Sequence, residues 1–280
     1  MSIGRRETFL VISNMRCGST WLVAALGALP DIATDYEFKW RVPYSPSDLH
    51  MVVDRASPPV SQLLDNICPR SAVVGSKFVF DGCALSDREF TQFASKLDPE
   101  LRIIHLTRRF RDIFLSRRRG CFHQLNQDFA GRIGTKLKAA IVDADIGTLG
   151  AMKSSSPVKP VDCYRELKTY LRNDASIARL ATSGRPYLRV RYEEVKARMF
   201  EIARFAGCAA PADAMFEATR QSPTVKLPAI DAASLVRNIA ELEPLFAHFE
   251  NLRKSAFDAA TVRDARRSFR SPAYADSRGW

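Results

Sequence analysis

The sequence predicts an α/β fold in which helices flank a parallel β-sheet. Short apolar runs, partly β-branched, occur at residues 9–12, 71–80, 101–107 and 187–190, as expected for strands buried on both faces. Segments with the apolar spacing of helices separate these runs. Strands that alternate with helices are typical of a parallel sheet, whose ligands bind at the carboxyl ends of the strands.

Each element is expected at a defined place along the chain. The first strand, residues 9–12, leads into a turn at Gly18 and then a helix over residues 21–26. Residues 33–59, which include Glu37, are predicted to be irregular, because the prolines in this stretch argue against long regular elements. The remaining helices are expected at residues 60–67, 87–97, 110–125 and 162–182, and again from residue 192.

The length and the charge set broad limits. The 280 residues favour a single domain, with an α/β core over residues 8–210 and a helical segment over residues 211–280. Lysine and arginine number 42 against 31 acidic residues, which gives a net charge of +11. Such a balance suits polyanionic ligands, among them nucleotides, acidic polysaccharides, nucleic acids and membrane surfaces.

The cysteines and the hydropathy indicate a cellular location. Six scattered cysteines form no C-x-x-C pair, so neither a zinc site nor a disulfide framework is indicated. Residues 1–8 are too short and too polar for a signal peptide, and no apolar run approaches the roughly 18 residues needed to cross a bilayer. We therefore expect a cytoplasmic protein without a transmembrane segment, which leaves peripheral membrane contact open.

The turn after the first strand has the features of an anion-binding loop. It belongs to residues 16–22, with the sequence RCGSTWL. Gly18 allows a close turn, and Ser19 and Thr20 can cap the following helix. Free amides at a helix N-terminus attract anions, and Arg16 adds a full positive charge. The stretch therefore predicts a cradle for a phosphate-like group.

This loop differs from that of nucleotide triphosphatases. Their motif is G-x-x-x-x-G-K-[ST], in which the lysine reaches the terminal phosphates. Aligned on Gly18, Ser13 takes the place of the first glycine and Ser19 takes the place of the lysine. Hydrolysis of ATP with magnesium is therefore disfavoured.

Two motifs in the chain resemble those of sulfotransferases. Residues 16–22 are similar to their 5′-phosphosulfate loop, [KR]-x-G-[ST]-T-x-L. The family's second signature, for the 3′-phosphate, is a strand followed by Arg and, eight residues later, Ser; Arg108 and Ser116 have this spacing after residues 101–107. The resemblance implies the P-loop-like sulfotransferase fold and the donor 3′-phosphoadenosine 5′-phosphosulfate (PAPS), with no metal required.

The resemblance also implies roles for individual residues in donor binding. Arg16 would stabilise the charge that spreads over the transferring sulfonate. Tyr192, in a Y-E-E segment similar to the family's Y-E-D-L, would lie near the adenine. The full set expected to bind the donor is Arg16, Cys17, Gly18, Ser19, Thr20, Trp21, Arg108, Ser116 and Tyr192.

A general base must remove the proton of the acceptor hydroxyl. Many sulfotransferases use His and others use Glu. Glu37 lies 21 residues after Arg16 in a Y-E-F context, which resembles a segment of bacterial trehalose-type sulfotransferases in which a Glu is the base. The alternatives are His50, His105, His123 and His248, of which His105 is expected in the core because it lies in the middle of a strand.

Other basic residues are candidates for contacts with donor or acceptor. Lys77 is expected at a strand end, in a G-x-K segment similar to those of trehalose-type and nodulation-factor sulfotransferases. Lys226 or Arg237, in a segment that resembles the carboxyl-terminal part of the nodulation-factor enzymes, can close over the donor. The arginines at residues 117–119 can select an acidic acceptor, although a solvated helix face is the simpler interpretation.

These observations favour a sulfotransferase that moves the sulfonate of PAPS, by in-line transfer, to a hydroxyl of an oligosaccharide, glycolipid or polysaccharide. The R-K-G-x-x-G-D-W-K signature of steroid and phenol sulfotransferases is absent, which argues against that branch. The alternatives are a small-molecule P-loop kinase, a non-catalytic binder of polyanions or nucleic acid, and a sulfotransferase fold that binds nucleotide without turnover.

Overall fold

Six parallel strands form the centre of the protein, in the order β3-β2-β4-β1-β5-β7. The computed structural model describes residues 6–40, 50–66, 71–80, 85–119, 123–125, 157–220, 224–226 and 236–258. The six strands are β1 (Glu7–Asn14), β2 (Ile32–Trp40), β3 (His50–Val53), β4 (Val73–Phe80), β5 (Arg102–Thr107) and β7 (Tyr187–Arg191). The predicted α/β class with a parallel sheet is confirmed.

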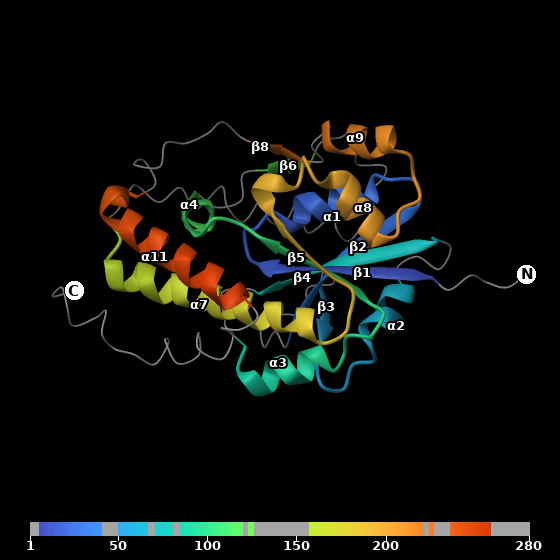
Figure 1. Cartoon of the computed structure of the whole chain (residues 1–280), viewed down its shortest axis with the longest axis horizontal. Coiled ribbons are helices and arrows are strands. Elements are labelled where there is room, and N and C mark those ends of the chain that lie inside the picture. Colours follow the sequence, from blue (N-terminus) through green and yellow to red (C-terminus); the bar gives the residue numbers. More distant parts are fainter. Residues whose placement is uncertain are drawn as a thin grey trace, which may run out of the picture.

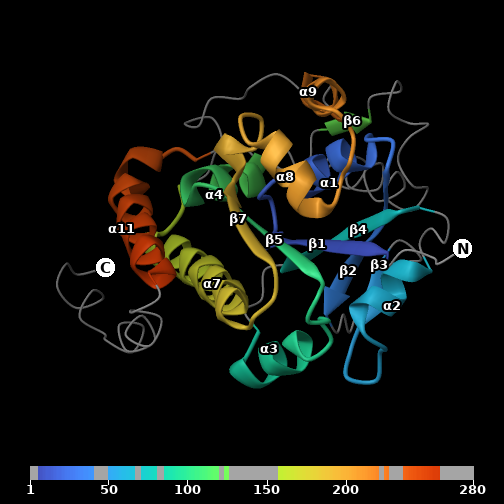
Figure 2. The same cartoon turned by 45° about the vertical axis from the view of Figure 1, so that its right-hand side comes forward.

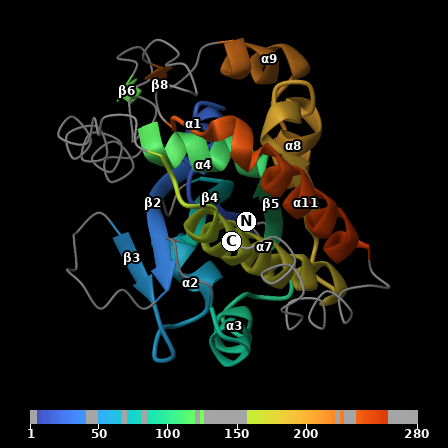
Figure 3. The ribbon, with the colours of Figure 1, turned by 90° about the vertical axis from the view of Figure 1, so that its left-hand side faces the viewer.

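Helices cover both faces of this sheet (Figure 1). On one side lie α1 (Ser19–Gly27) and α8 (Met199–Ala206), and on the other α2 (Val60–Asp65) and α3 (Asp87–Ala94), an arrangement that Figure 2 shows from a second direction. The helices α4 (Phe110–Arg119), α7 (Pro160–Ala178) and α11 (Ile239–Phe257) gather at the end to which the strands point (Figure 3). Ligands of parallel sheets bind at this end.

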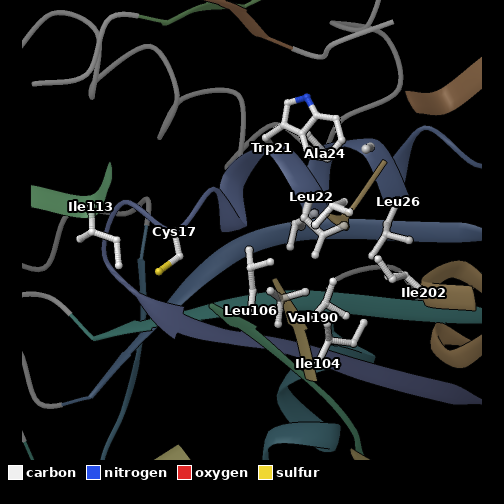
Figure 4. Packing of buried hydrophobic residues seen from close by; sticks show 14 of the residues in the cluster. Cys17, Trp21, Leu22, Ala24, Leu26, Ile104, Leu106, Ile113, Val190 and Ile202 are labelled. Atoms are coloured by element: carbon white, nitrogen blue, oxygen red, sulfur yellow. The ribbon is translucent and has the colours of Figure 1, made fainter. Parts of the chain in front are cut away.

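The strand β1 is buried on both faces. Phe9 and Val11 belong to one hydrophobic cluster, Leu10 and Ile12 belong to another, and none of the four is exposed to solvent. Because successive side chains of a strand point to opposite faces, an unbroken apolar run is what a central strand requires. In Figure 4, α1 packs against the strands through residues such as Leu22.

The prediction that residues 33–59 are irregular is wrong, because this stretch contains most of β2 and all of β3. In β2, Thr34, Glu37, Phe38 and Trp40 are all buried, and the register with β4 shifts between Thr34 and Glu37, so burial does not alternate regularly along this strand. The prolines at positions 58 and 59 immediately precede α2, and those at 43 and 46 lie outside the described residues.

The prediction of one helix over residues 110–125 is also wrong in part. The helix α4 ends at Arg119, and Leu125 lies in the strand β6 (His123–Leu125). That strand pairs antiparallel with β8 (Thr224–Lys226), so the segment after residue 211 contains a strand as well as the helices α9 (Ala212–Arg220) and α11. The expected helix over residues 162–182 is α7, followed by a 3₁₀ turn, η1 (Arg179–Thr182).

The helix α11 shares its core with the central sheet. Its buried residues Leu242, Phe246 and Phe249 belong to the same hydrophobic cluster as Phe9 of β1. Figure 3 shows α11 beside α7 and α4. Within the described parts of the chain, no helix combines the length and the apolar character needed to cross a membrane.

Candidate active site

The turn after β1 has an unusual backbone conformation. Arg16 and Gly18 both have positive φ, at 69° and 91°. A Cβ added at Gly18 would also overlap the ring of Tyr192, so glycine is required there by conformation and by space. Gly18, rather than Ser19 or Thr20, is the N-cap residue of α1, and no side chain caps that helix. The first amides of α1 thus have the usual capacity of a helix start to bind an anion.

The two motifs found in the sequence meet at this turn. Arg108, which follows β5, donates a hydrogen bond from Nη1 to the carbonyl oxygen of Arg16 at 3.0 Å, across 92 positions of sequence. Arg16 in turn donates from Nε to Ser116 Oγ of α4 at 3.3 Å, across 100 positions. Among the described residues, the buried Nε of Arg108 has no hydrogen-bond partner. An anion placed here would satisfy that donor.

Aromatic side chains border the same turn. Tyr192 opens the 3₁₀ segment η2 (Tyr192–Glu194) directly after β7. The guanidinium of Arg108 lies over its ring, 4.8 Å from the ring centroid. Trp21 of α1 meets Tyr192 edge to face, with the ring centroids 6.3 Å apart. Tyr192 therefore lies beside Gly18 and Arg108, and Trp21 lies beside Tyr192.

Glu37 and Lys77 are paired on neighbouring strands. They are register partners on β2 and β4, and Lys77 Nζ lies 2.5 Å from Glu37 Oε2. Lys77 also donates from Nζ to Thr20 Oγ1 of α1 at 2.6 Å. Only 9% of Glu37 and 4% of Lys77 are exposed to solvent. Glu37 lies in β2 rather than in an irregular loop, and Lys77 lies within β4 rather than at its end. A continuous polar chain thus joins the predicted base to Thr20, at the start of α1.

Cys17 faces away from this polar side of the turn. Its side chain is buried in the hydrophobic cluster between α1 and the strands (Figure 4). Burial raises the pKa of the Cys17 thiol well above its usual range. Its amide donates to the carbonyl oxygen of Asn14 within the turn. Of the residues expected to contact the donor, Cys17 therefore serves as a packing residue beneath the loop.

The histidines occupy different environments. His105 is fully buried in β5, as predicted, and its Nδ1 lies 2.6 Å from Tyr187 Oη. Burial lowers the pKa of the His105 imidazole below its usual value, more than the neighbouring Asp174 raises it. His50 begins β3 as the register partner of Glu37, and His123 lies in β6. Burial also lowers the pKa of His248, on α11.

The structure also gives the places of the other basic residues that the sequence singled out. Lys226 is in β8, opposite His123 of β6, and Arg237 is exposed in the turn before α11. Arg118 donates to Glu166 Oε2 of α7 at 3.0 Å. Arg117 and Arg118, in the last turn of α4, thus share Glu166 as an acidic partner within the protein.

A buried polar cluster lies behind the turn, and sequence reasoning missed it. Asn14 at the end of β1 donates from Nδ2 to Asp174 Oδ1 of α7 at 2.7 Å. Arg253 of α11 donates from Nη1 to the carbonyl oxygen of Arg108 at 2.7 Å. Asp174 continues the buried stripe formed by Leu167, Tyr170, Leu171 and Ile177. The sequence signal for this cluster was an aspartate at a helix position that continues a stripe of buried hydrophobic residues.

No protein-family model matches the chain, and no curated protein matches it at a significant level. A function is therefore proposed from the sequence motifs and from the arrangement of the site.

Proposed function

We propose that the protein is a sulfotransferase that uses PAPS as donor and a carbohydrate hydroxyl as acceptor. The observation that carries the proposal is the contact between the two motifs, in which Arg108 binds the backbone of Arg16, and Arg16 binds Ser116. PAPS carries two anionic ends on one nucleoside. A protein that binds it must bring two anion sites together, one for the 5′-phosphosulfate and one for the 3′-phosphate.

The donor fits this arrangement in three parts. The first amides of α1, preceded by the turn at Gly18, suit the 5′-phosphosulfate. The guanidinium of Arg108, with a buried Nε that has no partner among the described residues, and Ser116 suit the 3′-phosphate. Tyr192, which is partly buried, offers aromatic surface for the adenine, and Trp21, which is 7% exposed, packs edge to face against it.

The transfer would take place between Glu37 and the turn. Glu37 accepts the proton of the acceptor hydroxyl while the hydroxyl oxygen forms a bond to sulfur and the bond from sulfur to the bridging phosphate oxygen breaks. Negative charge develops on that bridging oxygen and is stabilised by the amides of α1 and by nearby cations. Lys77, which contacts both Glu37 and Thr20, is one such cation, and Arg16 is the other.

The class of acceptor rests on the resemblance to bacterial carbohydrate sulfotransferases. In this proposal the partners are a nucleotide donor and an oligosaccharide, glycolipid or polysaccharide, without nucleic acid or a bound metal. A cytoplasmic location, in which free cysteines such as Cys17, Cys163 and Cys208 stay reduced, is part of the same proposal.

Calorimetric titration with adenosine 3′,5′-bisphosphate, the product nucleotide, tests the donor site. We expect selective binding of the bisphosphate over ATP with magnesium. Arg108→Ala should weaken it by roughly 10- to 150-fold, the range for hydrogen bonds to charged groups. Arg165→Ala is the matched control, because it removes an exposed arginine of α7 that pairs with Asp162.

The outcomes separate the alternatives. A P-loop kinase would bind ATP with magnesium at least as well as the bisphosphate. A non-specific polyanion binder would show strongly salt-dependent binding that Arg108→Ala and Arg165→Ala weaken equally. Either result would overturn the proposal. After selective binding, transfer of labelled sulfate from PAPS to a panel of carbohydrates distinguishes an active enzyme from a fold that only binds nucleotide.

A further inference from the structure

The backbone turn that carries Arg108 is held by charged side chains from distant segments. Arg253 of α11 donates from Nη1 to the carbonyl oxygen of Arg108 at 2.7 Å. The amide of Arg109 donates to Glu193 Oε1 at 3.1 Å, and the amide of Phe110 donates to Glu250 Oε1 at 2.7 Å. Three consecutive residues are thus each bound by a charged side chain.

The same α11 side chains are connected to one another. Arg253 forms a further ion pair with Glu250 through Nη2 and Oε2, and it lies over the ring of Phe110, 4.3 Å from the centroid. Arg253 is only 4% exposed. Its guanidinium therefore has one well-defined position, fixed by charge, by hydrogen bonds and by packing against the ring.

Asp174 joins this group to the other donor loop. Its Oδ2 lies 3.4 Å from Arg253 Nη1, and its Oδ1 accepts a hydrogen bond from Asn14 Nδ2 at 2.7 Å. Asn14 is the last residue of β1, immediately before the turn that contains Arg16. One fully buried carboxylate therefore contacts the end of the first loop directly and the start of the second loop through Arg253.

We propose that Asp174 and Arg253 are positioning residues that set the separation between the two anion-binding loops. A buried ion pair is by itself weak support for stability, because apolar residues often replace one without loss. Here, however, Arg253 of the pair also donates a hydrogen bond to the carbonyl oxygen of Arg108. The Nε of Arg108 is the buried donor that has no partner among the described residues. The proposal rests on the proposed function, since it assigns the 3′-phosphate of the donor to Arg108.

The test compares two nucleotides that differ in one group. Adenosine 3′,5′-bisphosphate has the 3′-phosphate, and adenosine 5′-monophosphate lacks it. Arg253→Met removes the hydrogen bond to the carbonyl oxygen of Arg108. It should weaken binding of the bisphosphate about tenfold and change binding of the monophosphate by no more than about twofold, because Arg253 and Arg108 are coupled neighbours. In the background of Arg108→Ala, the same substitution should have little further effect, because both act on one interaction.

A matched control distinguishes positioning from general stability. Arg185 is also an arginine that holds backbone carbonyls, those of Ala94, Leu97 and Asp98, on the side of α3. Arg185→Met should destabilise the fold without any loss specific to the 3′-phosphate. Urea unfolding of each variant shows how much of the protein is folded in the titrations. If Arg253→Met does not fold, Arg253→Lys, which keeps the charge beside Asp174, takes its place with the same expected direction.

Two results would overturn the inference. One is an equal loss of affinity for the two nucleotides in the Arg253 variant. The other is a loss of affinity in the double variant with Arg108→Ala that equals the sum of the losses in the two single variants. Failure of the proposed function looks different, because the unmodified protein would then show no preference for the bisphosphate at all. Selective binding that Arg108→Ala abolishes and the Arg253 variants retain would reject the positioning role alone.

Discussion

Glu37 and Lys77 are partners in two ways, because they occupy opposite positions on β2 and β4 and their side chains form an ion pair of 2.5 Å. Both side chains are almost completely excluded from solvent. Removing one member of a buried pair leaves the other charge without compensation. The roles of Glu37 and Lys77 in catalysis and in stability must therefore be separated by experiment.

Replacement of the proposed base tests catalysis. Glu37→Gln keeps the size of the side chain but cannot accept the proton, so we expect the turnover rate to fall about 10²- to 10⁴-fold. Affinity for adenosine 3′,5′-bisphosphate should stay within about twofold. Glu201→Gln, on the exposed surface of α8, is the control. Retention of most activity in Glu37→Gln would point to another base, and His50, the register partner of Glu37, would be tested next.

The ion pair itself is tested by a double-mutant cycle on stability. Lys77→Met should lower the free energy of unfolding by ~3–5 kcal/mol, because it leaves the carboxylate of Glu37 buried beside an apolar group. The double variant Glu37→Gln with Lys77→Met should recover much of this loss. Urea unfolding of the four proteins measures the coupling. Strictly additive losses would show that the two side chains do not stabilise one another.

The turn after β1 gives a prediction with an internal control. Gly18→Ala meets both an unfavourable φ and overlap with the ring of Tyr192, whereas Gly184→Ala meets only a similar φ, with no atom within 4 Å of the added carbon. We expect Gly184→Ala to cost about 1 kcal/mol of stability and Gly18→Ala to cost more, about 2–3 kcal/mol. Binding of the bisphosphate should weaken in Gly18→Ala alone. Equal costs at the two positions would contradict the close approach of Tyr192.

His105 makes a defined contribution to the dependence of stability on pH. Burial lowers the pKa of its imidazole in the folded protein, whereas in the unfolded chain the imidazole binds a proton below about pH 6.5. The unfolded state therefore binds more protons as the pH falls from about 6.5 toward the lowered value, and stability decreases in that window. Unfolding at pH 7.5 and 5.5 should show a smaller decrease in His105→Gln than in the unmodified protein. Identical decreases would show that His105 does not contribute.

The central part of the fold could be predicted from the sequence because its signals are local. A strand such as β1 is buried on both faces and is read directly from an unbroken apolar run. The turn at Gly18 and the spacing of Arg108 and Ser116 also lie within short segments. These local signals were enough to predict that both sequence motifs lie at the carboxyl ends of strands.

The missed features depend on contacts between distant segments. The strand β2 lacks a regular alternation because its register with β4 shifts between Thr34 and Glu37, and Glu37 is buried beside Lys77 of the adjacent strand. Asp174 and Arg253 likewise gain their roles only when α7 and α11 pack together. Spacing along the chain carries no information on such pairings.

The hydrogen bonds from Arg253 and Glu250 of α11 to the backbone of Arg108 and Phe110 have a consequence for synthesis of the protein. Phe110 and Glu250, which form one of these contacts, are 140 positions apart. At 5–20 residues per second, translation takes roughly 7–30 s to deliver the second after the first. Throughout this interval the turn lacks the contacts from Glu250 and Arg253, and only Glu193 becomes available earlier, 84 positions after Arg109. The finished arrangement of the loop is therefore available only to chains that have been translated through α11.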